Sequence, residues 1–279
     1  MNATTSTPTA ASLPDYAPVP ASAFGPAPNE QGYHVGQVER NLYWVTDGVY
    51  QAAFLTTKDG VVLFDAPPSI GHNLQRAIDE IAQANGVSNK VTYLVHTHHH
   101  ADHAGASSLF GKDVVRIGHE ETRRLLLRDD DPARPAPDET FTDRRTLEIG
   151  GERIELAWHG PNHTPDNILI HFPEHDTLMM VDIVNVGWVP VYVVNLSDDI
   201  PGYLAMPAAA LTYPWGGVPL SNSPPPPGGT LGVPPPLVRG GGPGWGTSSR
   251  ISLSPIQIGE MVERSERTAL RKDVWDGVA

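Results

Sequence analysis

The sequence predicts an α/β fold with a metal site at the end of one of its central strands, and three observations support this. Short β-branched and aromatic runs alternate with segments of helical spacing along most of the chain. Asp-Gly pairs separate apolar runs near the N-terminus, a pattern typical of β-hairpins. Five histidines and an aspartate fall within eight residues, from His96 to His103, directly after the strand-like run Val91–Val95.

Length and composition restrict the possible functions. The 279 residues suffice for one large α/β domain with its own core. The net charge is −13, and Lys and Arg form no cluster, which disfavours nucleic acid as a partner because phosphate backbones are bound by clustered basic residues. Cysteine is absent, so any metal must be held by histidine and carboxylate.

The N-terminal segment is rich in Thr, Ser, Pro and Ala. Residues 1–28 have neither a basic n-region nor an apolar h-region, and we predict a disordered leader there rather than a signal peptide. No apolar stretch approaches the roughly 18 residues of a membrane span. We therefore expect a cytoplasmic protein with no membrane contact.

Strands and helices are expected in a regular order after this leader. Residues 41–65 are expected to form a three-stranded meander, and Asn85-Gly86 closes the helix that follows it. A helix is expected to begin at the N-cap Ser197. The expected strands are 42–45, 49–56, 61–64, 91–95, 114–117, 147–149, 153–158, 168–172 and 178–181, and the expected helices are 70–81, 104–110, 120–128 and 197–211.

The histidine-rich loop predicts a metal site with a definite register. His98 and His100 are two residues apart, so on an extended loop both point to one side. Asp102 and His103 follow where a helix should begin, and two such pairs can hold two metals about 3.5–4 Å apart. His99 points the opposite way and is predicted not to be a ligand. The alternative is a solvated His-rich tract, against which the preceding strand and the enclosed aspartate both argue.

At this point the sequence resembles a known family. Residues 97–105, THHHADHAG, resemble the T-H-x-H-x-D-H-x-G signature of the metallo-β-lactamase superfamily and match it at every fixed position. The resemblance runs from about Asn41 to about Pro214. It implies a four-layer αββα sandwich, in which two sheets pack face to face, helices lie outside and the metal loops lie at one edge. His96 could extend the set of His98 and His100, but it lies nearer the strand and is expected behind the ligands.

Two further motifs follow in the family's order. Residues 159–167, HGPNHTPDN, resemble its G-x-x-H-T-P stretch, although Asp166 stands where the family usually has Gly. The resemblance implies that His163 joins His98 and His100 as a three-nitrogen set, the arrangement of a catalytic zinc with an open position for water. It also implies that Asp182 bridges two metals.

Other polar residues near these motifs have less specific expectations. Asp65 either supports the metal loop from behind or simply forms a turn. His119 is expected at the surface or capping a helix, and His159 is expected to pack or support rather than bind metal. His171 and His175 are expected on the exposed side or in the turn of a hairpin.

The predicted function is metal-dependent hydrolysis of a small molecule. The resemblance implies one or two Zn²⁺ ions, with Fe or Mn as alternatives, and Asp102 would orient the attacking water and accept its proton. The β-lactam-hydrolysing branches usually carry Cys or Ser in place of Asp182, which favours an ester, lactone or thioester substrate. Trp188 and Tyr192 either line the substrate cleft or belong to the core.

The C-terminal quarter departs from the family. We expect the metallo-β-lactamase-like domain over residues 29–214, a Pro/Gly-rich low-complexity segment over 215–250 and a C-terminal helix over 251–279. The family normally carries a last histidine for its second metal in this region, yet no histidine follows His175. Either the second metal is lost or weakened, or another residue replaces the histidine, or the coding sequence is out of frame from about Gly216.

Two other functions remain open from the sequence. One is a mononuclear iron enzyme of the same fold, of the dioxygenase type, and the other is a catalytically impaired metal-binding domain. Metal content would separate the first from a zinc hydrolase, and activity on a substrate panel with metal fully loaded would separate the second. The sequence makes no prediction of the oligomeric state.

Overall fold

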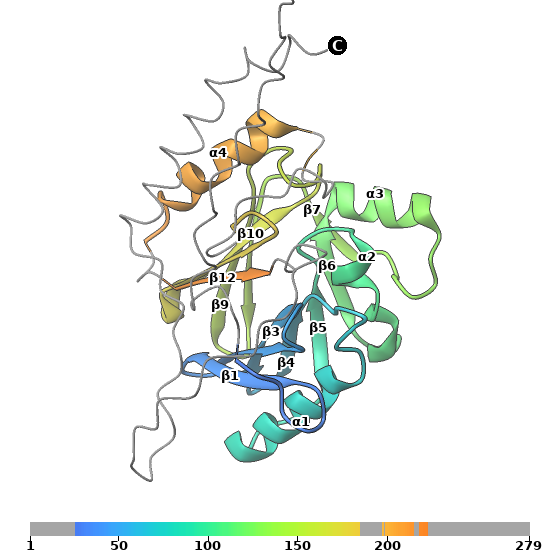
Figure 1. The fold of residues 1–279 in the computed structure, drawn as a ribbon, viewed down its shortest axis with the longest axis vertical. Helices are drawn as coiled ribbons and strands as arrows, with labels where there is room; N and C mark the ends of the chain where they lie inside the picture. Colours follow the sequence, from blue (N-terminus) through green and yellow to red (C-terminus); the bar gives the residue numbers. More distant parts are fainter. Residues whose placement is uncertain (1–25, 185–196, 198, 215–217, 223–279) are drawn as a thin grey trace, which may run out of the picture.

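Two β-sheets face each other, and helices cover their outer faces (Figure 1). The computed structural model describes residues 26–184, 197, 199–214 and 218–222. The two facing sheets and the helices outside them form the expected four-layer αββα sandwich. Within the described residues, no helix has both the length and the apolar character needed to cross a membrane.

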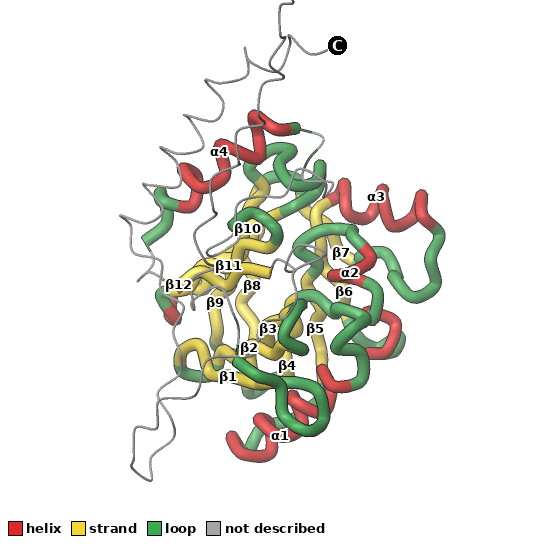
Figure 2. Tube along the Cα trace, viewed as in Figure 1, coloured by secondary structure: helices red, strands yellow, loops and turns green. Residues whose placement is uncertain are grey.

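The first sheet has seven strands in sequence order, β1 to β7 (Figure 2). β1 to β4 pair antiparallel as a meander, whereas β4 to β7 pair parallel to one another. The first and last of these strands, β1 and β7, were not expected from the sequence. The strands are β1 His34–Glu39, β2 Leu42–Thr46, β3 Gln51–Thr57, β4 Gly60–Phe64, β5 Val91–Val95, β6 Val115–His119 and β7 Glu139–Phe141.

The second sheet has five strands in the order β12-β11-β10-β9-β8. β8 to β11 pair antiparallel, and β12 joins β11 in parallel, with Asn222 opposite Val181. β12 lies within the segment expected to be of low complexity. The strands are β8 Arg144–Ile149, β9 Glu152–Trp158, β10 Ile168–Phe172, β11 Thr177–Val181 and β12 Val218–Asn222.

The helices follow the expected order with two differences. The helix expected over 104–110 is replaced by two short ones, and the last helix is capped by Asp199, whose side chain accepts from the Gly202 N–H, rather than by Ser197. His119 was expected either at the surface or as a helix cap, and it caps the N-terminus of α3. The helices are α1 Asn73–Asn85, α2 Ala101–Ala104, η2 Ser107–Phe110, α3 Glu120–Asp129, η3 Pro173–His175 and α4 Ile200–Ala210.

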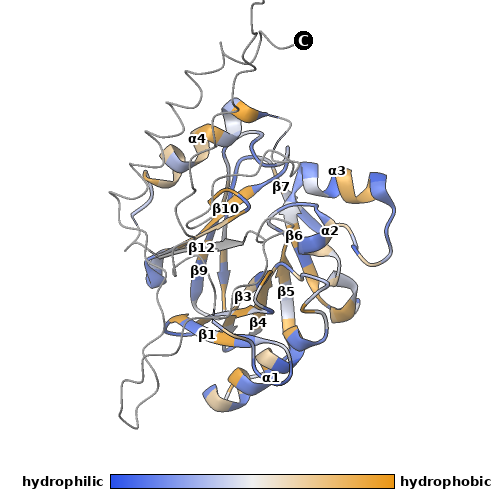
Figure 3. Cartoon of the chain, in the orientation of Figure 1, coloured by the Kyte–Doolittle hydropathy of each residue, from blue (hydrophilic) through white to orange (hydrophobic). Residues whose placement is uncertain are grey.

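The main core lies between the two sheets and is formed by buried apolar side chains from both. The strands that contribute to it include many hydrophobic residues (Figure 3). Phe64 of β4 meets Phe172 of β10 edge to face, with ring centroids 4.9 Å apart. A second core forms where α1 packs on the outer face of the first sheet, and a third where α4 packs on β10 and β11. The helices therefore cover both outer faces, which leaves strand ends as the places for a polar site.

Two aspartates mark the strand ends that surround this site. Asp65 follows β4 and Asp182 follows β11, and both have left-handed backbones, with φ of 62° and 60°. A residue other than glycine in this region costs free energy, of order 1–3 kcal/mol, which the surrounding structure must offset. Such backbone strain often concentrates at functional sites, and here it directs both carboxylates toward the loop that follows β5.

Candidate metal centre

The loop after β5 is held from behind by Asp65. One carboxylate oxygen of Asp65 accepts from the Thr97 backbone N–H at 2.8 Å, and the other accepts from the Thr97 hydroxyl at 2.6 Å. Thr97 Oγ1 lies 3.0 Å from His98 Nδ1. Because the hydroxyl proton is given to Asp65, Thr97 Oγ1 accepts the Nδ1 proton of His98. The Nε2 atom of His98 is thereby left without a proton and free to bind a metal.

Four side chains converge in front of this loop. His98, His100, His163 and Asp182 each offer one ligand atom, and these atoms all lie within 4.8 Å of one another. His163 Nε2 is 3.2 Å from His100 Nδ1 and 3.3 Å from Asp182 Oδ2. His98 Nε2 is 3.5 Å from the same Asp182 oxygen. We call the three imidazoles of His98, His100 and His163 the three-histidine half of the centre.

The protonation of the three-histidine half suits a metal ion. Burial, together with the neighbouring imidazoles, lowers the pKa of His98 well below its usual value and lowers that of His100 to about 4. Both rings are therefore neutral at neutral pH, the form that binds metals. His98 Nε2 and Asp182 Oδ1 are buried and lack a hydrogen-bond partner among the described residues. A bound cation would satisfy both atoms, so the donor set fits a transition metal.

His103 and Asp102 extend the cluster on one side. His103 Nε2 lies 3.0 Å from Asp182 Oδ2 and 3.7 Å from Asp102 Oδ2. Burial alone would lower the pKa of His103, but the Asp182 carboxylate, with Asp65 and Asp102, raises it to about 9. Burial likewise opposes the charge of Asp182, yet His103 holds the pKa of this carboxyl well below its usual range. We call Asp102, His103 and the shared Asp182 the carboxylate half of the centre.

Comparison with known proteins identifies the family of this chain. A family model described as the metallo-beta-lactamase superfamily matches residues 45–238. The chain belongs to the metallo-beta-lactamase superfamily. The predicted family and fold are thus confirmed, which places the chain among hydrolytic and oxidative metalloenzymes.

Curated relatives in the superfamily cover part of the chain. The 2,4-dinitroanisole O-demethylase subunit alpha of Nocardioides sp. (strain JS1661) is 29% identical over 182 residues, which are 63% of this chain and 53% of that protein. Metallo-beta-lactamase IND-1 of Chryseobacterium indologenes is 30% identical over 151 residues, 50% of this chain and 60% of the relative. The chain thus spans between half and two thirds of the length of these relatives.

Solved structures of the superfamily share the fold. A metallo-beta-lactamase from Pontibacter korlensis superposes with a TM-score of 0.58 at 22% identity, covering 69% of this chain and 92% of that one. Metallo-beta-lactamase IND-7 superposes with a TM-score of 0.61 at 19% identity, covering 84% of this chain and all of the other (100%). At these identities the likeness concerns the arrangement of the two sheets and their helices.

The other histidines near the superfamily motifs have partners elsewhere. His99 Nδ1 lies 2.8 Å from the buried carboxylate of Asp166, which also ties the two metal loops together. His159 Nε2 lies 2.8 Å from the Tyr213 hydroxyl. His96 is fully buried without a hydrogen-bond partner among the described residues. None of the three belongs to the cluster of four ligand atoms within the described part of the chain.

His171 and His175 were expected on the exposed side or in the turn of a hairpin; His175 lies in the turn between β10 and β11, but both side chains are buried. His171 and His175 are each 3% exposed. His171 Nδ1 lies 2.9 Å from Glu155, and its Nε2 lies 3.3 Å from the Pro214 carbonyl oxygen. The expectation was wrong for His171 because β10 is covered on both faces, by the opposite sheet and by α4 with the segment after it.

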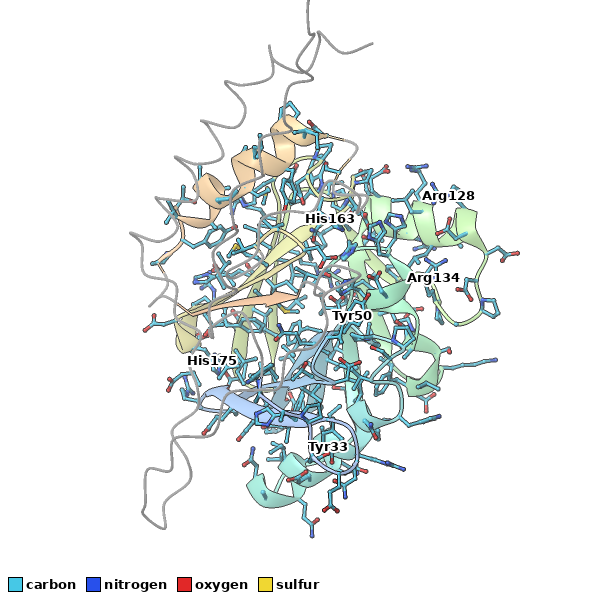
Figure 4. The ribbon with its side chains drawn as sticks, viewed as in Figure 1. Tyr33, Tyr50, Arg128, Arg134, His163 and His175 are labelled. Carbon is cyan, nitrogen blue, oxygen red and sulfur yellow. The ribbon has the colours of Figure 1, made fainter. Side chains whose placement is uncertain are left out.

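Tyr50 enters the site from the turn between β2 and β3 (Figure 4), and no feature of the sequence predicted this. Its ring centroid lies 5.7 Å from that of His103, edge to face. Burial, with the nearby Asp102 carboxylate, raises the pKa of Tyr50 to about 12. The phenol therefore keeps its proton at neutral pH and is a hydrogen-bond donor beside Asp102. An aromatic residue after an Asp-Gly turn carries no motif, so only the fold reveals it.

The remaining predicted site residues lie outside the described part of the chain. This applies to Trp188 and Tyr192, to the leader and to the C-terminal helix. β12 lies in the region where the resemblance implied a strand with a last histidine, and its residues, VPLSN, contain none. Its final residue, Asn222, pairs with Val181, which directly precedes Asp182.

Proposed function

We propose that this chain is a metal-dependent hydrolase that acts on a small ester, lactone or thioester. The observation that carries the proposal is the convergence of His98, His100, His163 and Asp182, with ligand atoms within 4.8 Å of one another and two of their buried polar atoms unpartnered. Three imidazoles with a carboxylate and no thiolate are ligands that suit zinc. The three-histidine half would hold the first ion, and the carboxylate half a second.

The chain's own residues would then perform the proton chemistry. Zinc, when bound, supplies a water of lowered pKa and a Lewis acid for the substrate's carbonyl oxygen. The Asp102 side chain is 41% exposed and stands at the open side of the cluster, so it can orient the attacking water and accept its proton. The Tyr50 hydroxyl, which stays protonated, can donate a hydrogen bond to the oxygen on which negative charge develops.

The substrate class rests on Asp182 and on the relatives. The superfamily resemblance associates Cys or Ser at this position with β-lactam hydrolysis, and here an aspartate is present. One relative is named for removing a methyl group from 2,4-dinitroanisole, an aryl methyl ether. An aryl ether and a β-lactam therefore belong in the substrate panel beside the esters, lactones and thioesters.

The test compares metal-loaded protein on this panel. We expect turnover of at least one ester, lactone or thioester, its loss on chelation and its return with added zinc. His163→Ala should abolish turnover, whereas the control variant His72→Ala, at an exposed histidine outside the cluster of four ligand atoms, should not change it. No turnover of any substrate by the loaded protein would favour the impaired metal-binding domain. Turnover that required iron and dioxygen would favour the oxidative alternative.

A further inference from the structure

We propose that Glu152, Glu174 and His175 form a second divalent-cation site, separate from the metal centre. β9 begins at Glu152 and runs toward the loop that carries His163. The turn η3, with Glu174 and His175, joins β10 to β11 at the end of β11 that lies away from Asp182. The site is thus at the opposite end of the five-stranded sheet, and His163 and His175 stand well apart in Figure 4.

The three side chains are close enough to share one ion. Each offers one ligand atom, and the three atoms lie within 4.8 Å of one another. His175 Nε2 lies 3.7 Å from Glu152 Oε2 and donates to Asn41 Oδ1 at 3.0 Å, so Nδ1 is the unprotonated ring atom that can bind a metal.

Two buried polar atoms at this place lack partners. Glu152 is 8% exposed and His175 is 3% exposed, and neither Glu152 Oε2 nor His175 Nδ1 has a hydrogen-bond partner among the described residues. The other oxygen, Oε1, accepts from Asn41 Nδ2 at 3.0 Å and lies 3.9 Å from Arg40 Nη2. Arg40 and Asn41 therefore satisfy one oxygen of Glu152 and leave the other unpaired. An unpaired buried carboxylate oxygen is costly, and a bound cation would offset that cost.

The local charge also favours a cation. Three carboxylates, those of Glu39, Glu152 and Glu174, act on His175 against the single guanidinium of Arg40. Burial nevertheless dominates and lowers the pKa of His175, so that its imidazole is neutral at neutral pH and can bind a metal. One imidazole with two carboxylates suits Zn²⁺ or Mn²⁺. Glu174 is exposed, which leaves part of the coordination sphere to water.

An ion here would act on stability rather than on catalysis. It would join the β10–β11 turn to the start of β9. The β1–β2 turn would be held to the same point, because Asn41 also contacts His175 Nε2 at 3.0 Å and Arg40 donates to the Glu174 carbonyl oxygen at 3.2 Å. The cation would therefore tie the edge of the first sheet to the second sheet.

The test removes ligands of the metal centre and measures the Zn²⁺ binding that the variant retains. In a His100→Ala/His103→Ala/His163→Ala background, which removes imidazoles from both halves of the metal centre and is freed of metal by chelation, Zn²⁺ is titrated against a chromophoric chelator. We expect one bound equivalent, whose Kd rises at least about tenfold in Glu174→Gln. The matched control Glu148→Gln, which neutralises an exposed glutamate on β8, should leave the Kd unchanged. Added Zn²⁺ should raise the Tm of the background protein and of the control, but not that of Glu174→Gln.

The same pair of glutamine variants in the otherwise unchanged chain provides a second readout. Glu174→Gln should bind one equivalent fewer than Glu148→Gln at the same free Zn²⁺ concentration, and loss of folding in the background cannot affect this comparison. Equal Zn²⁺ binding by the two variants, or no binding to the folded background protein, would overturn the proposal. Activity has no part in this readout, so a failure of the proposed hydrolase function leaves the result intact.

Discussion

The two halves of the metal centre share Asp182 but differ in the protonation of their imidazoles. In the three-histidine half, burial and neighbouring rings hold the pKa of His100 at about 4 and that of His98 well below its usual value. In the carboxylate half, Asp182 raises the pKa of His103 to about 9 against the effect of burial. At neutral pH His98 and His100 are therefore neutral donors, whereas His103 holds a proton in an ion pair with Asp182.

This difference sets the order in which the halves should bind metal. His98 and His100 need no deprotonation, and the Asp65–Thr97–His98 chain already directs His98 Nε2 toward the centre. The carboxylate half must lose the His103 proton and break its contact with Asp182 before His103 can bind metal. The missing last histidine of the superfamily weakens this half further. We therefore expect tight binding of one ion and weaker binding of a second.

Removing a ligand from the three-histidine half should have the largest effect. We expect His163→Ala to lower affinity for the first ion by more than the roughly 10–100-fold that loss of a supporting partner costs, and to abolish turnover. Elemental analysis of protein purified without added metal measures the metal content per chain, which should fall in His163→Ala. His72→Ala, which removes an exposed histidine, is the control. Unchanged metal content in His163→Ala would contradict the assignment of this half.

Removing His103 should affect the second half alone. His103→Ala is expected to keep one tightly bound ion and to lose the weaker one, because His103 is the one imidazole assigned to that half within the described residues. Zinc titration followed by calorimetry would resolve the two steps in the unchanged chain and one step in the variant. Two steps of unaltered affinity in the variant would show that another group holds the second ion.

The halves also differ in how far the sequence predicted them. His98, His100, Asp102 and His103 follow one strand within six residues, so local geometry alone places them together. His163 and Asp182 could be added only because motif order resembled a family. The structure brings all of these side chains into one cluster or into contact with it.

Long-range packing explains what the sequence did not predict. Tyr50 reaches His103 from a turn more than fifty residues earlier, and the His99 contact with Asp166 joins two separate loops. No periodicity encodes such contacts. The burial of His175 was missed for the same reason, since the Asn41 side chain that meets it belongs to the other sheet.

Asp65 offers a way to weaken the three-histidine half without removing a ligand. Asp65→Asn keeps the shape but replaces one acceptor oxygen with an amide, so the Thr97 hydroxyl or N–H loses its acceptor. We expect a 10–100-fold loss of affinity for the first ion. The same zinc titration measures it, with Asp59→Asn at the exposed β3–β4 turn as the control. An effect no larger than that of the control would mean that Asp65 merely forms a turn.

The smallest predicted effect is also the most direct test of the protonation difference. In the metal-free chain the pKa of His103 is about 9, so at pH 7 this ring holds a proton that must be released when His103 binds an ion. The affinity for the second ion should then rise with pH, by at most about tenfold per pH unit, as long as His103 still holds that proton. The first ion meets His98 and His100 rings that are already neutral, so its affinity should depend less on pH. Calorimetric titration in two buffers of different ionisation enthalpy counts the protons released at each step. Equal release at both steps would show that the two halves start from the same protonation state, and that the carboxylate half is weaker only because it lacks a histidine.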